Sequence, residues 1–223
     1  MGKVEKIGNL ILWGLQGFLI FLLIFQSSFA LPLTGIGHLH PLILHLPIGF
    51  GVLLLALFSI KKHLPSFEIV AEFLLLLTAI FSTMTAIFGL FLAKEGGYET
   101  SALDWHQWSG VAVSFVYFTW VLARRNFLVG ASLGFIALIF AGHTGASITH
   151  GENYLRIGSK AVEITTESVV FEDIVQPILK AKCESCHNDQ KTKGALKMNS
   201  IANLMKGGKH GAIWKAGDVL NSH

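Results

Sequence analysis

Five long apolar stretches most constrain what this chain of 223 residues can fold into. A helix that crosses a bilayer needs about 20 mostly apolar residues. Stretches of this kind occupy residues 7–29, 41–60, 68–92, 107–123 and 127–149. The fourth is short, but Trp105 and Trp108 flank it, and tryptophan favours the membrane interface. The sequence therefore predicts an all-α membrane protein with five transmembrane helices in contact with the lipid bilayer.

The charged residues separate this membrane part from the rest of the chain. Of the 17 Lys and Arg and the 14 Asp and Glu residues, 13 lie in residues 1–151 and 18 in residues 152–223. Charged side chains make up 14% of the chain, against about 25% in soluble domains, which excludes an ordinary soluble enzyme. We expect an N-terminal anchor over residues 1–35, a His-rich four-helix membrane bundle over 36–151, a linker over 152–168 and a small soluble domain over 169–223.

Positive residues beside the spans predict the orientation, because cytoplasmic loops carry an excess of Lys and Arg. Three pairs flank the spans, namely Lys3 and Lys6, Lys61 and Lys62, and Arg124 and Arg125. With five spans all three pairs fall on one side, which we assign to the cytoplasm of a bacterial inner membrane. The C-terminal domain is then periplasmic. The first apolar run is longer than the 7–15 residues of a signal-peptide core, so we expect it to be retained as an anchor.

Cys183, Cys186 and His187 form the pattern C-x-x-C-H, the attachment signature of a c-type haem. The two thiols bond to the vinyl groups of the porphyrin, and the histidine supplies the proximal ligand of the iron. A disulfide, a redox C-x-x-C and part of a zinc site are the alternatives. Zinc needs two more Cys or His ligands, and no such cluster stands out in the sequence. We therefore expect one covalently bound haem c.

The residues around this motif resemble the planctomycete-type cytochrome c domain. The matching segments are residues 171–179, residues 193–198, the pair Gly207-Gly208 and residues 216–218. The family pattern reads F-x-x-I-x-P-I-L, C-x-x-C-H, K-G-G-L, a Gly-Gly pair and P-G-x-P, and Ala195 and Ala216 depart from it. The resemblance covers residues 169–223 and implies a small α-helical cytochrome. Because that domain usually continues to a Met-Pro segment, we expect an incomplete domain and a natural end beyond residue 223.

The sixth ligand of that iron has three candidates inside the chain, which are Met198, Met205 and His210. A methionine also serves as apolar filler, and His210 can be a solvated surface residue. The ligand can also lie beyond residue 223, so the sequence leaves it open.

Six histidines lie at or near the predicted outer ends of the membrane helices, namely His38, His40, His45, His106, His143 and His150. Ionisable residues in a membrane are costly and mark function by default. At a rise of 1.5 Å per residue, His45 lies roughly 7 Å inward from Pro41, and His143 lies about 10 Å inward from His150. Two histidines at one depth on facing helices suit a b-type haem. We therefore predict His45 and His143 as the ligands of its iron.

His40, His106 and His150 form a shallower layer, for which a second b-type haem or a quinone is the expected occupant. For His45 and His143 as well, the alternatives are structural roles at loops and helix contacts, and a quinone or metal site, because neutral imidazole also binds metal ions. Small residues near His143 allow a macrocycle or a neighbouring helix to approach closely. They are Ala141, Gly142, Gly145 and Ala146.

Residues 40–49 read H-P-L-I-L-H-L-P-I-G. This segment resembles the H-P-x-x-x-H-x-P-I-G signature of a bacterial four-helix membrane family of unknown function. That family also has a histidine at the start of its third helix and a G-x-x-x-x-H-G segment near its last, which His106 and residues 145–151 match. The resemblance covers about residues 36–155. The helix over residues 7–29 lies outside it, as an added anchor.

Together these features predict a membrane-anchored multihaem cytochrome subunit. It would relay electrons between an intramembrane b-type haem or the quinone pool and the periplasmic haem c or a redox protein partner. We expect it to belong to a larger membrane complex and to be an electron-transfer subunit instead of a self-contained enzyme, because the sequence shows no catalytic triad, phosphate-binding loop or paired-carboxylate site.

Two other functions stay open. One is an anchor or scaffold subunit in which the histidines are structural. The other is a quinol-oxidising site on the periplasmic side, where His106 or His150 accepts protons beside Asp104 or Glu152. A nucleic-acid partner is not expected, because the tail has no basic stripe with interleaved aromatic residues.

Overall fold

The computed structural model describes most of the chain. It describes residues 2–25, 34–95, 100–123, 126–150, 154–155 and 169–223, except for 185, 190, 191, 216, 219, 221 and 223. The described residues form helices and no strand, which confirms the all-α prediction for this part of the chain. They divide into two units, Met1–Glu95 with Asp104–Thr144, and Gly96–Leu103 with Gly145–His223. The predicted linker, except residues 154–155, lies outside the described residues, as do Arg124, Arg125, Glu152 and Ala216.

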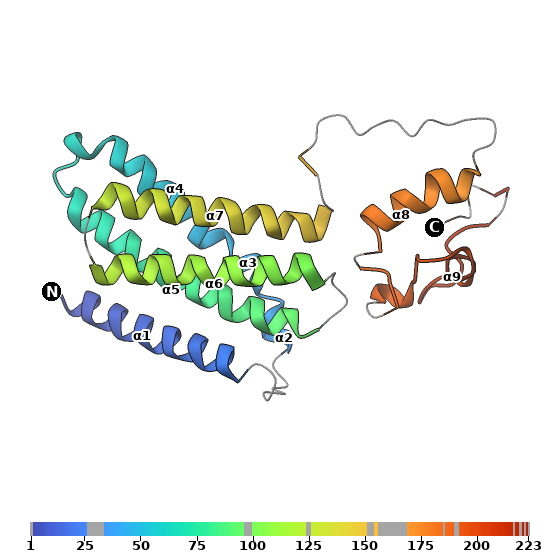
Figure 1. Ribbon diagram of the computed structural model, residues 1–223, viewed down its shortest axis with the longest axis horizontal. Coiled ribbons are helices and arrows are strands. Elements are labelled where there is room, and N and C mark those ends of the chain that lie inside the picture. The colour runs from blue at the N-terminus through green and yellow to red at the C-terminus, as the bar shows by residue number, and fades with distance from the viewer. Residues whose placement is uncertain are drawn as a thin grey trace. The chain divides into compact units, whose positions relative to one another are not determined.

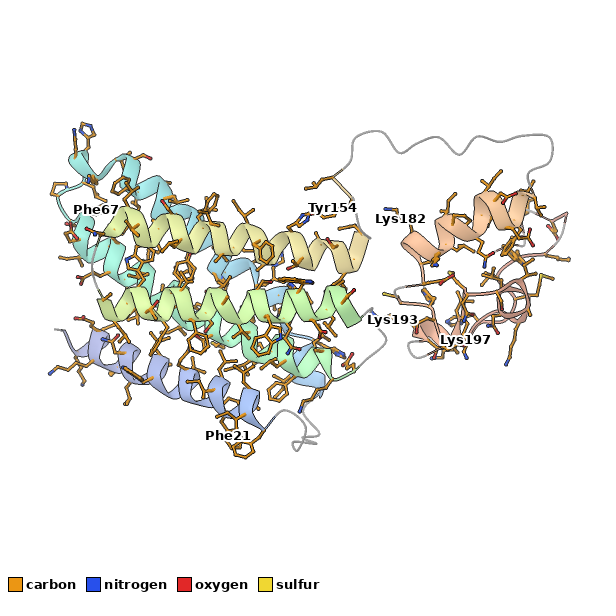
Figure 2. The ribbon with its side chains drawn as sticks, viewed as in Figure 1. Phe21, Phe67, Tyr154, Lys182, Lys193 and Lys197 are labelled. Atoms are coloured by element: carbon orange, nitrogen blue, oxygen red, sulfur yellow. The ribbon has the colours of Figure 1, made fainter. Side chains whose placement is uncertain are left out.

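Long helices make up the first unit, and residues 100–103 and 145–150, at the ends of two of them, fall in the second unit. In chain order they and the short helices between them are α1 (Lys3–Ile24), α2 (Thr34–Gly37), α3 (His40–Ile43), α4 (His45–Ser59), α5 (Phe67–Ala93), α6 (Thr100–Ala123) and α7 (Phe127–His150). Figure 1 shows α1, α5, α6 and α7 running side by side, and hydrogen bonds join α5 to α6 and α6 to α7. In Figure 2, Phe67 marks the N-terminal end of α5.

Four segments among the described residues are long and apolar enough to cross a membrane. They are Lys3–Ile24, Gly35–Ser59, Phe67–Ala93 and Phe127–His150. The predicted span over residues 107–123 lies within α6, which has 24 residues and a length of about 36 Å. Its length suits a membrane, but polar residues such as Asp104, His106 and Gln107 lower its apolar character. The count of five spans therefore stays a prediction.

The predicted helix over residues 41–60 is interrupted near its start. Pro41 lies in the first turn of α3, where a missing N–H is tolerated. Pro47 cannot donate a hydrogen bond to the carbonyl four residues earlier, so α3 ends at Ile43 and α4 begins at His45. This break puts His40 and His45 on separate helices.

The core of this unit forms around α5, which packs against α1, α2, α3 and α4. Tyr117 of α6 is 1% exposed and lies in the largest buried cluster. A Cβ atom on Gly51 or Gly134 would lie 2.9 Å or 2.8 Å from the Tyr117 hydroxyl oxygen. These glycines therefore let α4 and α7 approach the ring, in keeping with the close packing by small residues that joins helices in membranes.

A buried polar cluster joins the added helix α1 to the bundle. The Gln16 Oε1 atom accepts hydrogen bonds from Thr83 Oγ1 at 3.2 Å and from Ser114 Oγ at 3.0 Å. The two hydroxyls lie 3.0 Å from each other, and all three side chains are at most 1% exposed. Since hydrogen bonds between membrane helices average about 0.6 kcal/mol each, the cluster orients α1 more than it stabilises it.

Short helices make up the described part of the C-terminal tail. They are a π-helix (Val170–Val175), α8 (Gln176–Lys182), a 3₁₀ turn (Lys193–Ala195) and α9 (Ile201–Lys206). Ser200 caps α9 by accepting a hydrogen bond from the Asn203 amide at 3.3 Å, and Leu204 is 1% exposed. A Cβ atom on Gly208 would lie 2.7 Å from the Gly194 carbonyl oxygen, so the glycine pair allows two loops to touch. Figure 2 shows Lys182 at the end of α8 and Lys197 on the loop before α9.

Candidate functional site

Two histidines meet inside the membrane unit. His40 on α3 and His106 on α6 have ring centroids 5.9 Å apart, and their ring planes are inclined by 81°. Both side chains are half-buried. We call these residues the His40–His106 pair.

Each ring of the pair is tied through Nδ1 to the backbone of a further helix. His40 Nδ1 lies 2.9 Å from the Thr85 carbonyl oxygen on α5. His106 Nδ1 lies 3.1 Å from the Ala141 carbonyl oxygen on α7. A carbonyl only accepts, so each Nδ1 carries the proton and donates it. In the neutral ring, Nε2 is then the unprotonated nitrogen, which can bind a metal or accept a hydrogen bond.

Glycines expose both of these carbonyls. Gly89 follows Thr85 by four residues, and Gly145 follows Ala141 by four residues. On a helix, the side chain at such a position leans back over the preceding turn. A Cβ atom on Gly89 would lie 3.1 Å from both Nδ1 and Cε1 of His40. Glycine at this register therefore lets the imidazole reach the helix backbone.

Two hydroxyl groups, of Thr144 and Ser109, also contact His106. Thr144 Oγ1 lies 3.4 Å from His106 Nδ1 and 3.0 Å from Ser109 Oγ. Ser109 Oγ in turn donates to the His106 carbonyl at 3.0 Å. The His106 ring is therefore oriented by contacts from α7, while Ser109 on α6 contacts Thr144 and the His106 backbone.

The other predicted membrane histidines are placed differently. His45 is exposed, and its Nδ1 atom lies 3.3 Å from the Leu42 carbonyl oxygen within the same segment. His143 is exposed on α7. His150 is exposed at the end of α7, with its ring 5.9 Å from the ring of Tyr154. The structure thus brings together His40 and His106, two members of the predicted shallow layer. The assignment of His45 and His143 as haem ligands stays a prediction.

Sequence reasoning missed the residues that support the pair, which are Thr85, Gly89, Ser109 and Thr144. The one available signal was Gly89, a lone glycine among bulky apolar residues of α5. His38, also at this end of the bundle, has its Nε2 atom 2.6 Å from a Glu95 carboxylate oxygen. That contact connects the segment after α2 to the residues that follow α5.

The C-x-x-C-H segment forms a tight turn at the end of α8. The amides of Cys186 and His187 both donate to the Cys183 carbonyl at 3.0 Å. The two thiols are not joined in a disulfide. His187 Nδ1 lies 3.1 Å from the Leu196 carbonyl oxygen, so Nε2 is again the unprotonated nitrogen. The donor set of two thiols and one oriented imidazole fits covalent haem attachment.

The loop that supplies the Leu196 carbonyl is held by several hydrogen bonds. The Met198 amide donates to the His187 carbonyl at 2.8 Å. Asp189 accepts from Lys197 Nζ at 2.9 Å and from Asn199 Nδ2 at 2.8 Å. The hydrogen bond from Lys197, followed by the Lys197 charge, lowers the pKa of Asp189. These hydrogen bonds connect residues 197–199 to His187 and Asp189.

One position of this loop bears on the family resemblance. Ala195 has a φ of +56°, in the left-handed region that favours glycine. In the resembled pattern a glycine occupies this position. The left-handed backbone at Ala195 is one that the glycine of the resembled pattern would adopt without strain.

The three predicted sixth ligands are in different surroundings. Met198 is half-buried, and its backbone pairs with that of His187. Met205 is 58% exposed, and its sulfur accepts a hydrogen bond from Trp214 Nε1 at 2.9 Å. His210 is exposed in the turn between Gly208 and Gly211. The sixth ligand remains open among them.

The long apolar helices define a multi-pass integral membrane protein whose bundle contains paired histidines. Residues 37–155 match the family model described as "Predicted membrane protein (DUF2231)". The match covers more than half of the chain, so this protein belongs to that family, which confirms the resemblance expected for residues 36–155. Comparison with curated proteins and with solved structures gave no match. The family range includes both members of the His40–His106 pair and ends before Cys183.

Proposed function

We propose that this protein is a membrane-anchored c-type cytochrome that transfers electrons on the periplasmic side of a bacterial inner membrane. The observation that carries the proposal is the hydrogen bond from His187 Nδ1 to the Leu196 carbonyl. It leaves Nε2 for an iron, directly after the turn that holds Cys183 and Cys186. Metal-binding histidines regularly use their second ring nitrogen in this way.

Three residues of this chain would hold the haem. Cys183 and Cys186 would bond to its vinyl groups, and His187 would ligate the iron as the proximal residue. When bound, the haem supplies reversible one-electron chemistry, while the protein sets ligation and orientation. The Leu196 carbonyl holds the His187 ring in place and makes Nε2 a stronger ligand.

The membrane bundle would be the other end of the electron path. In this proposal electrons pass between an intramembrane b-type haem or the quinone pool and the covalent haem or a redox partner, within a larger membrane complex. The positions of Lys3, Lys61 and Lys62 support a cytoplasmic N-terminus. The length of α6 supports its inclusion as a fifth span, which a periplasmic tail requires.

A second candidate function is a scaffold in which the membrane histidines are structural. The observation that favours it is that His40 connects α3 to α5 and His106 connects α6 to α7 by side-chain to backbone hydrogen bonds. Such bonds stabilise helix contacts without any cofactor. Haem content separates this function from electron transfer.

The test is expression of the full chain in a bacterium that carries the c-type haem attachment machinery. Haem that stays with the polypeptide after denaturing electrophoresis is expected for the wild type. It should be lost when Cys183→Ala and Cys186→Ala are combined and retained in Lys206→Ala, an exposed residue of the same tail. A wild-type membrane fraction that contains the chain without covalent haem would overturn the proposal.

A further inference from the structure

We infer that His40 and His106 are the two axial ligands of one b-type haem iron inside the membrane bundle. The inference rests on the proposed function and deepens it. It assigns the intramembrane redox site to this pair in place of His45 and His143.

The distance between the two rings suits a single metal. An imidazole nitrogen binds a metal at about 2.0–2.1 Å, and the ring centre lies roughly 1 Å further out, so two rings on opposite sides of one iron have centroids about 6 Å apart. The observed separation is 5.9 Å. The separation of the two rings therefore matches that of two axial ligands of one iron.

The protonation pattern suits coordination as well. Each Nδ1 is committed to a backbone carbonyl, of Thr85 for His40 and of Ala141 for His106. Each neutral ring thus has Nε2 as its unprotonated nitrogen, and no proton has to be released for binding. The same use of Nδ1 occurs at His187, the predicted ligand of the covalent haem.

The number and location of the ligands favour haem among metal cofactors. A porphyrin supplies four nitrogens and needs two axial ligands, whereas a structural zinc ion takes four protein ligands. Helix bundles hold such cofactors between side chains of facing helices. Here the two ligands come from α3 and α6, and their anchoring carbonyls come from α5 and α7. All four elements lie within the family's range.

Haem analysis of the purified full chain tests the assignment. Acidic acetone extracts b-type haem and leaves covalent haem on the protein, and the pyridine haemochrome spectrum identifies each. We expect extractable haem in the wild type and a loss of about tenfold or more in both His40→Ala and His106→Ala, with covalent haem unchanged. His63→Ala is the control, because His63 is exposed in the turn after α4, and His143→Ala should also retain the haem.

The outcomes separate this inference from the proposed function. Absence of extractable haem in a wild type that carries covalent haem overturns the inference alone. Absence of covalent haem in a wild type that carries extractable haem overturns the covalent site alone. Extractable haem that survives in His40→Ala and His106→Ala but is lost in His45→Ala and His143→Ala assigns it to the other pair.

Two further measurements do not depend on removing a ligand. Ring planes inclined by 81° predict a strongly anisotropic low-spin electron paramagnetic resonance signal, while the rhombic signal of parallel imidazoles would contradict the geometry. Gly89→Ala places a methyl group 3.1 Å from His40 Nδ1 and should lower haem affinity about tenfold, as a disturbed ligand hydrogen bond does. Gly142→Ala, with no atom within 4 Å of its new Cβ, is the matched control, and equal affinity in the two variants would refute the role of Gly89.

Discussion

Replacement of Ala195 by glycine should stabilise the C-terminal tail, although glycine usually destabilises a folded chain. Ala195 has a φ of +56°, and this left-handed conformation costs a residue with a Cβ roughly 1–2 kcal/mol. Glycine relieves that cost but gives up about 0.4–1 kcal/mol by adding freedom to the unfolded chain. The net expectation for Ala195→Gly is a gain of about 0.5–1 kcal/mol.

Hydrogen exchange of the full chain measures this effect locally. Amides of residues 187–211 should exchange more slowly in Ala195→Gly, because the Leu196 carbonyl next to the substitution holds the His187 ring. Ala202→Gly is the matched control, since Ala202 is exposed within α9 and the same substitution there should cost about 0.5–1 kcal/mol. Loss of protection of similar size in both variants would refute the left-handed conformation at residue 195.

Three further predictions concern charge, buried polarity and packing. Asp189 has a lowered pKa in the fold. Its contribution to stability is therefore present above the ordinary aspartate pKa of about 4 and is lost as the pH falls through the lower folded value. Asp189→Asn should abolish this acid dependence, measured as hydrogen-exchange protection in residues 187–199. Gln16→Leu should change the free energy of unfolding in detergent by less than about 1 kcal/mol. It removes two intramembrane hydrogen bonds of about 0.6 kcal/mol each, but it also removes a buried Nε2 atom that has no hydrogen-bond partner among the described residues. A loss above about 3 kcal/mol would contradict this balance. Gly134→Ala should destabilise the bundle by about 1–3 kcal/mol, because its Cβ would lie 2.7 Å from the Tyr117 ring, and an unchanged unfolding midpoint would show that this contact is not tight.

Local pattern made much of the architecture predictable. Runs of apolar residues predicted α1, α5 and α7, because a helix in a bilayer satisfies its own backbone and needs only apolar length. The conformation of the loop after His187 was harder to predict from the sequence. The sequence placed an alanine where the resembled pattern has glycine, and only the structure shows that Ala195 keeps a left-handed φ.

The break between α3 and α4 also has a local cause, which the apolar composition of residues 41–60 does not reveal. An apolar count treats residues 41–60 as one helix, but Pro47 cannot donate to the carbonyl of Ile43. The depth estimate predicts which histidines lie at one level of the membrane. The structure shows which backbone carbonyl each ring contacts. His45 lies in its own short-range contact with Leu42.

The sequence by itself determined that this is an integral membrane protein, that its histidines gather toward one end of the helices, and that a C-x-x-C-H motif lies in the tail. Each of these depends on residues close together in the chain, where composition and spacing are decisive. Only the tertiary structure decided that His40 meets His106, across 65 intervening residues. That contact depends on Gly89, where the missing Cβ makes room for the His40 ring beside the Thr85 carbonyl, and such close approach between helices has no counterpart in local sequence.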